Sequence, residues 1–428
     1  MINVSLLFIL FAGVVFLGYI LNAMFYKFKI SSILPMLLIG LLIGPLLHLV
    51  DTSQTSVVVE ITPIITAIAV AFILFDVGMN IRISSLRNIL LKASIFTILT
   101  STVTGVIASI ILHYAFGWGL LVSLMVGFAM SGTTSIVLPP LFKFLKVSED
   151  MKTSLAYQSV FNDVFSLVIP LIFFNILETG KYSINYVAGE LGGFVVGSLL
   201  LGIALAAFWI FILKKFKKYS SGYSWMLTLT IVVAVYGISE YLGFNGALST
   251  FIFGILLANI PDIKFLSKAS LRPIFDDIEH IKTYQKEITF FVSTFFFVYI
   301  GMLFQIQGFK YWTVGIAGLI CIVMLLVRYL TTDILNGIIS TGKHKKSDKT
   351  LMLFYVAQGL APTVVATLPA TIGLAVPNLI DVTFLVILIT NGILSVGLYL
   401  YASERGKESR NVERTFGRAA KATPKAGK

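Results

Sequence analysis

Long apolar segments dominate the chain and limit what it can fold into more than any other feature. Of its 428 residues, 57% are hydrophobic and 12% are charged. A helix rises about 1.5 Å per residue, so about 20 apolar residues cross a hydrocarbon layer about 30 Å thick. Backbone polar groups inside a bilayer must be hydrogen-bonded, so we predict an all-α integral membrane protein with thirteen transmembrane helices. The predicted spans are 4–25, 31–50, 61–80, 89–112, 118–142, 153–177, 185–213, 223–241, 243–260, 287–305, 311–334, 349–372 and 379–401.

Basic residues gather in every second connection, whereas the remaining connections hold only Lys181 and Lys310. The positive-inside rule then places the N-terminus outside and the C-terminus in the cytoplasm, as an odd number of spans requires. The net charge of +12 therefore indicates membrane orientation and contact with anionic lipid, and no nucleic-acid partner is expected. We expect a multi-pass protein of a prokaryotic plasma membrane.

Two segments outside the spans have their own patterns. The connection 261–286 mixes charged and apolar residues and is typical of an amphipathic interfacial helix. The basic tail 403–428 is predicted to be disordered. The chain carries no phosphate-binding loop and no Cys/His cluster with metal-ligand spacing, so we expect no cofactor.

One span carries a polar stripe. Ser159, Asn162, Asp163 and Ser166 recur at i, i+3, i+4 and i+7, so they share one face of a helix. Asp163 lies roughly 15 Å from either end of its span. A carboxylate at that depth costs at least about 2.5–3.5 kcal/mol. Either a hidden Lys or Arg neutralises Asp163 in a structural role, or Asp163 binds a cation or a proton.

Two other spans contain candidate helix breaks. The fifth span carries Gly132, Thr133 and Thr134, and the twelfth carries Gly359 and Pro362. Glycine and proline have poor helix propensity, and small polar side chains can satisfy the backbone groups that a break frees. The alternative is a pair of kinked but continuous helices.

The sequence also contains an internal repeat. Residues 29–44 resemble 243–258, residues 74–79 resemble 297–302, and Gly132 matches Gly359. Spans one to six thus correspond to spans eight to thirteen, and matched spans run in opposite directions. This pattern predicts a six-helix inverted-topology repeat with two broken crossing helices. Such repeats are typical of secondary transporters, whose sites lie near the membrane midplane at broken helices.

The Asn162-Asp163 pair and the two candidate helix breaks make residues 1–402 resemble the monovalent cation/proton antiporter superfamily, especially the NhaP-like sodium/proton antiporters. The likeness also rests on 75–78, 297–302 and Arg328. It implies an NhaA/NhaP-like fold in which Asp163 carries the ion or proton. Ser159 and backbone oxygen from 132–134 are the further ligands that it implies.

The sequence departs from the NhaP-like pattern at two places. Gly132, Thr133 and Thr134 replace a Thr-Asp-Pro run, and 131–137 is closer to the potassium-efflux (Kef-like) branch. Gln158 replaces the Glu that usually pairs with the Arg of span eleven. We therefore expect a structural role for Arg328, whose possible partners are Asp76, Asp333 or carbonyl groups at a helix C-terminus.

Oxygen atoms suit a hard monovalent cation. Asp163, the hydroxyls of Ser159 and Thr134 and the freed carbonyls of 132–133 would supply them. Burial disfavours the charged carboxylate, so proton and cation compete for it. A single titrating group predicts electroneutral one-for-one exchange. Asn162 is expected to bond backbone groups at the break. For Asp76 the sequence leaves three roles open: it supports the ligands of the cation from behind, it lines the inner funnel, or it is a simple interfacial carboxylate.

The predicted function is secondary active exchange of a monovalent cation, most of all sodium, for protons by alternating access. The alternatives are a Kef-like potassium/proton antiporter, a cation channel, and an intramembrane aspartyl protease that uses Asp76 and Asp163. No enzyme activity is expected. A core bundle (61–177 and 287–401) should move against a dimerisation bundle (1–50 and 185–260) in a homodimer.

Overall fold

The described part of the chain is entirely helical. The computed structural model describes residues 12–20, 31, 33–50, 60–81, 90–134, 141, 147, 149–180, 184–220, 224–260, 272–304, 310–338 and 346–422, and no strand occurs among them. The first half contains α2 (Ile33–Leu41), the π-helical turn η1 (Leu42–Leu46), α4 (Thr62–Asn80), α5 (Leu90–Phe116), α6 (Leu120–Ala129), α8 (Glu149–Thr179) and α9 (Ile184–Ser220). The second half contains α10 (Ser224–Tyr241), α11 (Gly246–Ala258), α12 (Arg272–Leu303), α13 (Tyr311–Ile338), α14 (Lys346–Phe354), α15 (Leu360–Thr371) and α16 (Leu379–Ala422).

Six of these helices are long and apolar enough to cross a membrane. Their apolar parts are Pro63–Asn80, Thr97–Phe116, Val196–Lys215, Ile278–Leu303, Tyr311–Thr332 and Leu379–Arg405. Six shorter apolar stretches lie in α2 with η1, α6, the second half of α8, α10, α11 and α15. The fold is therefore that of a multi-pass membrane protein, and the thirteen predicted spans remain an expectation.

Two elements differ from the expectation. Residues 272–286 do not form a separate interfacial helix, because α12 runs unbroken from Arg272 to Leu303. No Gly or Pro stands between Pro273 and Gly301, so nothing in the sequence stops the helix. In addition, α16 continues to Ala422, through most of the tail for which disorder was predicted. Its Glu, Lys, Arg and Ala residues are good helix formers.

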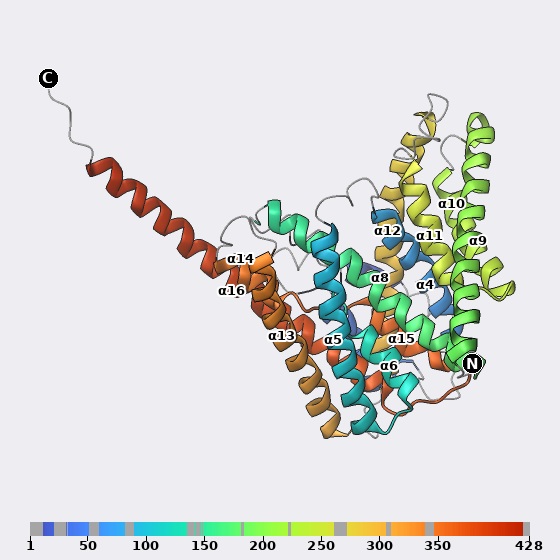
Figure 1. Cartoon of the computed structure of the whole chain (residues 1–428), viewed down its shortest axis with the longest axis horizontal. Helices are drawn as coiled ribbons and strands as arrows, with labels where there is room; N and C mark the ends of the chain where they lie inside the picture. The colour runs from blue at the N-terminus through green and yellow to red at the C-terminus, as the bar shows by residue number, and fades with distance from the viewer. Residues whose placement is uncertain are drawn as a thin grey trace.

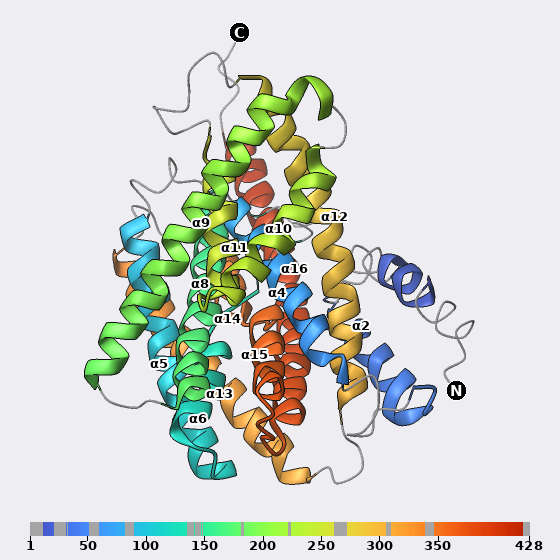
Figure 2. The ribbon, with the colours of Figure 1, turned by 90° about the vertical axis from the view of Figure 1, so that its right-hand side faces the viewer.

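The helices form a bundle with two sides and a centre. Figure 1 shows α9, α10 and α11 on one side, α5 and α13 towards the other, and α6, α8 and α15 between them. The C-terminal part of α16 projects from the body. From the second direction, α4, α11 and α8 lie near the middle, and α2 lies beside α12 (Figure 2). The centre of the bundle therefore brings together segments from both halves of the chain.

Glycines let two pairs of helices touch backbone to backbone. In α4, Gly78 lies against Phe251 O of α11, and Gly254 of α11 lies against Phe75 O of α4. In the second pair, Gly40 of α2 lies against Val298 O of α12, and Gly301 of α12 lies against the backbone of α2. A Cβ atom at any of these positions would collide with main-chain atoms, so glycine is required for the close approach.

Candidate functional site

Two non-helical stretches, the two interruptions, meet in the centre of the bundle. After α6 ends, Gly132–Thr134 is not helical, and Tyr355–Gly359 is not helical between α14 and α15. The Thr134 N–H donates to Ala357 O at 2.9 Å, so these stretches lie side by side. A Cβ on Gly359 would lie 2.5 Å from that of Thr134, so only glycine fits there. Both interruptions occur at the residues for which the sequence predicted them.

Gln358 ties the two interruptions together. Its side-chain amide donates to Met130 O at 2.9 Å and also to Gly132 O. The Gln358 backbone is held in turn by α16, because Asn391 Nδ2 donates to its carbonyl at 2.8 Å and its N–H donates to Thr390 Oγ1. Backbone groups freed by one break are thus satisfied by a buried side chain from the other. Pro362 lies in the first turn of α15, where its missing N–H costs no helical hydrogen bond.

Asn162 and Ser166, two residues of the predicted polar stripe of α8, lie at this crossing. Asn162 Nδ2 donates to Thr133 Oγ1 at 2.8 Å, and Ser101 Oγ of α5 donates to Asn162 Oδ1 at 2.8 Å. Ser166 Oγ donates to the Asn162 carbonyl at 2.6 Å. A Cβ on Gly132 would lie 2.6 Å from Ser166 Oγ. Asn162 was expected to bond backbone groups at the break. Its side chain instead contacts two hydroxyls, because Thr133 places one within reach.

Ser159 contacts a residue that the sequence did not indicate. Its Oγ lies 2.8 Å from the hydroxyl of Tyr355, and that hydroxyl donates to Thr134 O at 2.5 Å. Ser159 and Tyr355 are completely buried. Two predicted ligand groups, the Ser159 hydroxyl and the Thr134 carbonyl, are therefore joined through one phenol. A tyrosine four residues before Gly359, beside a predicted break, is the only signal that could have pointed to it.

Arg328 of α13 is buried and holds the end of α14. Its Nε donates to Met352 O at 2.6 Å, and its Nη2 donates to Gln158 Oε1 at 3.2 Å. The guanidinium carbon also lies 5.5 Å from the centre of the Tyr355 ring. Of the partners considered from the sequence, the C-terminal carbonyl is the one found. Asp333 has no described side chain, and Gln158 was not foreseen as a partner.

The two predicted carboxylates are described to different extents. Asp163 lies in α8, but its side chain lies outside the described residues. Asp76 is half-buried near the C-terminal end of α4. Its charge interacts with Lys286 and Lys282 of α12, and Asn80 of its own helix also bonds it. These partners are not residues of the two interrupted stretches, which favours a role for Asp76 apart from the crossing.

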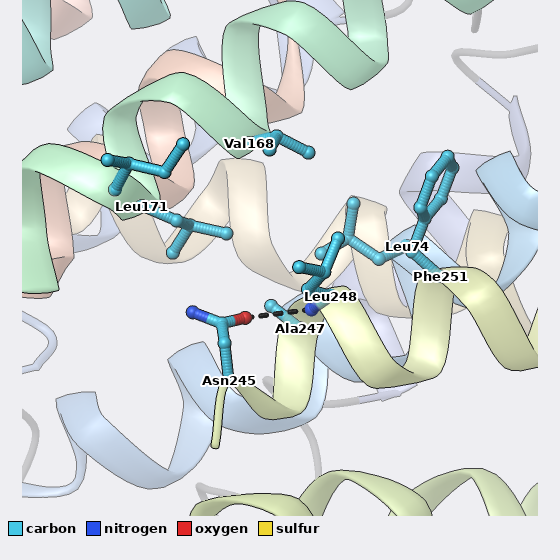
Figure 3. A pocket seen from close by; sticks show the side chains of 8 residues that line it. Leu74, Val168, Leu171, Asn245, Ala247, Leu248 and Phe251 are labelled. Carbon is cyan, nitrogen blue, oxygen red and sulfur yellow. Dashed lines mark hydrogen bonds between the residues drawn. The ribbon is translucent and has the colours of Figure 1, made fainter. Parts of the chain in front are cut away.

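An apolar pocket lies between α4, α8 and α11. Leu74, Val168 and Leu171 contribute to its walls, and Asn245 and Phe251 lie on its α11 side (Figure 3). The Asn245 side chain caps the start of α11, since its Oδ1 accepts from Leu248 N at 2.7 Å. None of the residues that line the pocket carries a charge, so it is unsuited to bind a cation.

Comparisons with known proteins agree with this architecture. The family described as "Sodium/hydrogen exchanger, transmembrane" matches residues 12–401. A relative called Na(+)/H(+) antiporter 1, from Methanocaldococcus jannaschii, is 23% identical over 84% of this chain and 82% of its own length. The K(+)/H(+) antiporter NhaP2 of Shewanella is 27% identical over 46% of this chain and 35% of its own length.

Among solved structures, the sodium proton antiporter MjNhaP1 from Methanocaldococcus jannaschii has a similar fold. The TM-score is 0.70 at 20% sequence identity, and the match covers 93% of this chain and 96% of that one. At this identity the likeness concerns the fold alone. It extends over nearly the whole chain.

Proposed function

We propose, on the premise that the chain belongs to the sodium/hydrogen exchanger family of membrane transporters, that it exchanges sodium for protons across a membrane. The observation that carries this proposal is the crossing of two interrupted helices beside the polar stripe of α8. Interrupted helices at mid-membrane expose backbone oxygens that are suited to a small cation. The relative named as a sodium/proton antiporter, which aligns over most of both chains, supports sodium as the cation.

Asp163 is the proposed carrier of cation or proton. It stands in α8 beside Asn162, whose side chain contacts Thr133 at the first interruption. Ser159 Oγ and Thr134 O, which lie on either side of the Tyr355 hydroxyl, are the proposed neutral ligands. This set combines one carboxylate with hydroxyl and carbonyl oxygens. Proton and sodium compete for Asp163, and alternating access converts that competition into exchange.

Asn162, Thr133 and Gly132 are assigned to the shape of the site. Asn162 bridges Ser101 on α5 and Thr133, so it holds α8, α5 and the first interruption in register. Gly132 allows the broken backbone to lie against Ser166. One titrating carboxylate in the core makes the exchange one-for-one and electroneutral. Asp76 serves the cytoplasmic entrance, beside the lysines of α12.

We also propose the thirteen-span architecture with its inverted repeat. The repeat relates α2 to α11 and α4 to α12, so Gly40 corresponds to Gly254 and Gly78 to Gly301. Gly40 packs on Gly301, and Gly254 packs on Gly78. The contact between Gly40 and Gly301 therefore corresponds to the contact between Gly254 and Gly78 when the two repeats are exchanged. A two-fold relation between the halves of the chain accounts for this correspondence.

These two glycine contacts lie between the proposed bundles. Gly78 and Gly301 belong to the core bundle, whereas Gly40 and Gly254 belong to the dimerisation bundle. The apolar pocket of Figure 3 lies along the same seam, between α4 and α8 on one side and α11 on the other. Relative movement along this seam is the proposed basis of alternating access. The protein is a homodimer in a prokaryotic plasma membrane, with the N-terminus outside and the C-terminus in the cytoplasm.

Potassium is the second candidate cation. Gly132, Thr133 and Thr134 replace the acidic run of NhaP-like proteins, so the first interruption contributes no carboxylate to the site. A weaker field of neutral oxygens suits the larger ion. The similarity to K(+)/H(+) antiporter NhaP2 supports this alternative over part of the chain.

The test uses purified protein in liposomes that enclose a pH-sensitive dye. After an acid-inside gradient is imposed, sodium, potassium or lithium is added outside and proton efflux is followed. The proposal predicts sodium-driven efflux whose apparent KM rises as proton concentration rises, while the maximal rate changes little. Efflux with potassium alone would select the second candidate. Cation flux without proton movement would indicate a channel and contradict exchange.

A further inference from the structure

The Tyr355 hydroxyl lies between two groups assigned to the cation. It is 2.8 Å from Ser159 Oγ and donates to Thr134 O at 2.5 Å. Tyr355 itself begins the non-helical stretch after α14, and Thr134 belongs to the other interruption. One phenol therefore connects α8 to both broken helices.

The direction of these hydrogen bonds follows from counting protons. A carbonyl oxygen can only accept, and the phenol has a single proton, which it gives to Thr134 O. The Ser159 hydroxyl must then donate its own proton to the tyrosine oxygen. The lone pairs of Ser159 Oγ consequently remain available to another partner. A carbonyl oxygen has two lone pairs, and the hydrogen bond from the phenol to Thr134 O uses one of them.

Tyr355 is held firmly enough to fix this arrangement. Its side chain is completely buried in an apolar cluster that also contains Tyr401. The Arg328 guanidinium lies over its ring, with the guanidinium carbon 5.5 Å from the ring centre. Without the phenol, a serine inside a helix commonly donates to the carbonyl four residues earlier, here that of Leu155. The Ser159 hydroxyl would then be oriented by its own helix.

We propose that Tyr355 is the positioning residue of the cation site. It does not bind the cation; it takes the Ser159 proton, so that Ser159 Oγ presents its lone pairs to sodium, and it holds the Thr134 carbonyl in place. The inference rests on the proposed function, because it takes Ser159 and Thr134 as ligands. Outer partners of this kind hold the ligands of metal ions in place, and their loss typically weakens metal affinity by about 10- to 100-fold.

The test compares Tyr355→Phe with Tyr401→Phe, which removes a phenol hydroxyl from the same buried cluster. The first readout is the sodium concentration that half-saturates thermal stabilisation of the purified protein in detergent. The second is the KM for sodium of proton efflux from liposomes. Tyr355→Phe should raise both by about tenfold, the lower end of the range for such partners, with kcat little changed. Tyr401→Phe should leave both at the wild-type value.

A double-mutant cycle with Ser159→Ala tests whether Tyr355 acts through its partners. Because the phenol orients Ser159, the combined variant should weaken sodium affinity by clearly less than the product of the two single effects. If the losses of sodium affinity in the two single variants simply multiply in the double variant, the proposal is overturned. It is also overturned if the Tyr355→Phe protein loses stability and maximal rate but keeps its KM for sodium. If Tyr355→Phe does not fold, 3-fluorotyrosine at position 355 keeps the shape and alters the hydroxyl as donor and acceptor. An unchanged sodium affinity in that protein would contradict the proposal.

The two readouts separate this inference from the proposed function. If the wild type is stabilised by sodium but moves no protons, the proposed exchange fails, and the comparison at Tyr355 is still decided by the stabilisation readout. If the wild type exchanges sodium for protons and Tyr355→Phe matches it in both readouts, only the positioning role fails. If sodium neither stabilises the wild type nor drives protons, both proposals fall.

Discussion

Replacing Gly254 by alanine should weaken the contact between α11 and α4. The added Cβ would lie 2.5 Å from Phe75 O, whereas ordinary van der Waals contact begins at 3.4 Å. The two helices would have to separate by nearly 1 Å. The opposing atom is main chain and cannot swing aside, so the cost should be in the range of about 1–3 kcal/mol that overpacking typically has. The apparent melting temperature should fall by about 1–3 °C, because the entropy of unfolding grows with chain length.

Gly318→Ala in α13 is the matched control. A Cβ there meets nothing within 4 Å, so the substitution adds a methyl group without a collision. It should be neutral or stabilising by up to about 1 kcal/mol, through helix propensity. The assay is the temperature at which half of the purified protein leaves the monodisperse chromatographic peak in detergent, heated at one fixed rate because unfolding of such proteins is commonly irreversible. Equal stability of Gly254→Ala and Gly318→Ala would refute the reasoning.

The remaining predictions concern Arg328, voltage and the repeat. Arg328→Ala should destabilise the fold by about 1–3 kcal/mol for each buried acceptor that loses its hydrogen bond, Met352 O and Gln158 Oε1. Normal heat stability with an altered KM for sodium would instead assign Arg328 to ion binding. Clamping the membrane potential with valinomycin should leave the rate of sodium/proton exchange unchanged, and acceleration by voltage would indicate a second titrating group. Gly301→Ala, at the repeat-related contact with α2, should lower the melting temperature about as much as Gly254→Ala, and a harmless substitution would argue against equivalent contacts.

Local patterns made much of the fold predictable. Apolar segments gave the helices to within a few residues at most boundaries; for example, the expected span 61–80 is α4, Thr62–Asn80. The interruptions could be foreseen because the residues around Gly132 and Gly359 have low helix propensity, which depends on residue type alone. The polar stripe of α8 follows from helical spacing alone, and Ser159, Asn162 and Ser166 are indeed buried.

Contacts between distant segments could not be predicted in this way. Tyr355 meets Ser159 across 196 positions, and Ser101 meets Asn162 across 61. Neither Tyr355 nor Ser101 stands out in its own segment, since a tyrosine and a serine are ordinary residues in a membrane helix. Arg328 was recognised as a buried charge, but its pairing with Gln158 and the end of α14 depends on how three helices pack.

The central claim is that one carboxylate, Asp163, carries sodium and protons in turn. Asp163→Asn keeps the shape of the side chain and removes its charge and its titratable proton, so the protein should fold. Its stability should be unchanged or higher, because a charge near the middle of an apolar span is lost. The decisive measurement is sodium-driven proton efflux from liposomes that contain this variant, with correct folding checked by its chromatographic peak. The account predicts that efflux falls to that of liposomes without protein. Retained exchange by folded Asp163→Asn protein would contradict it.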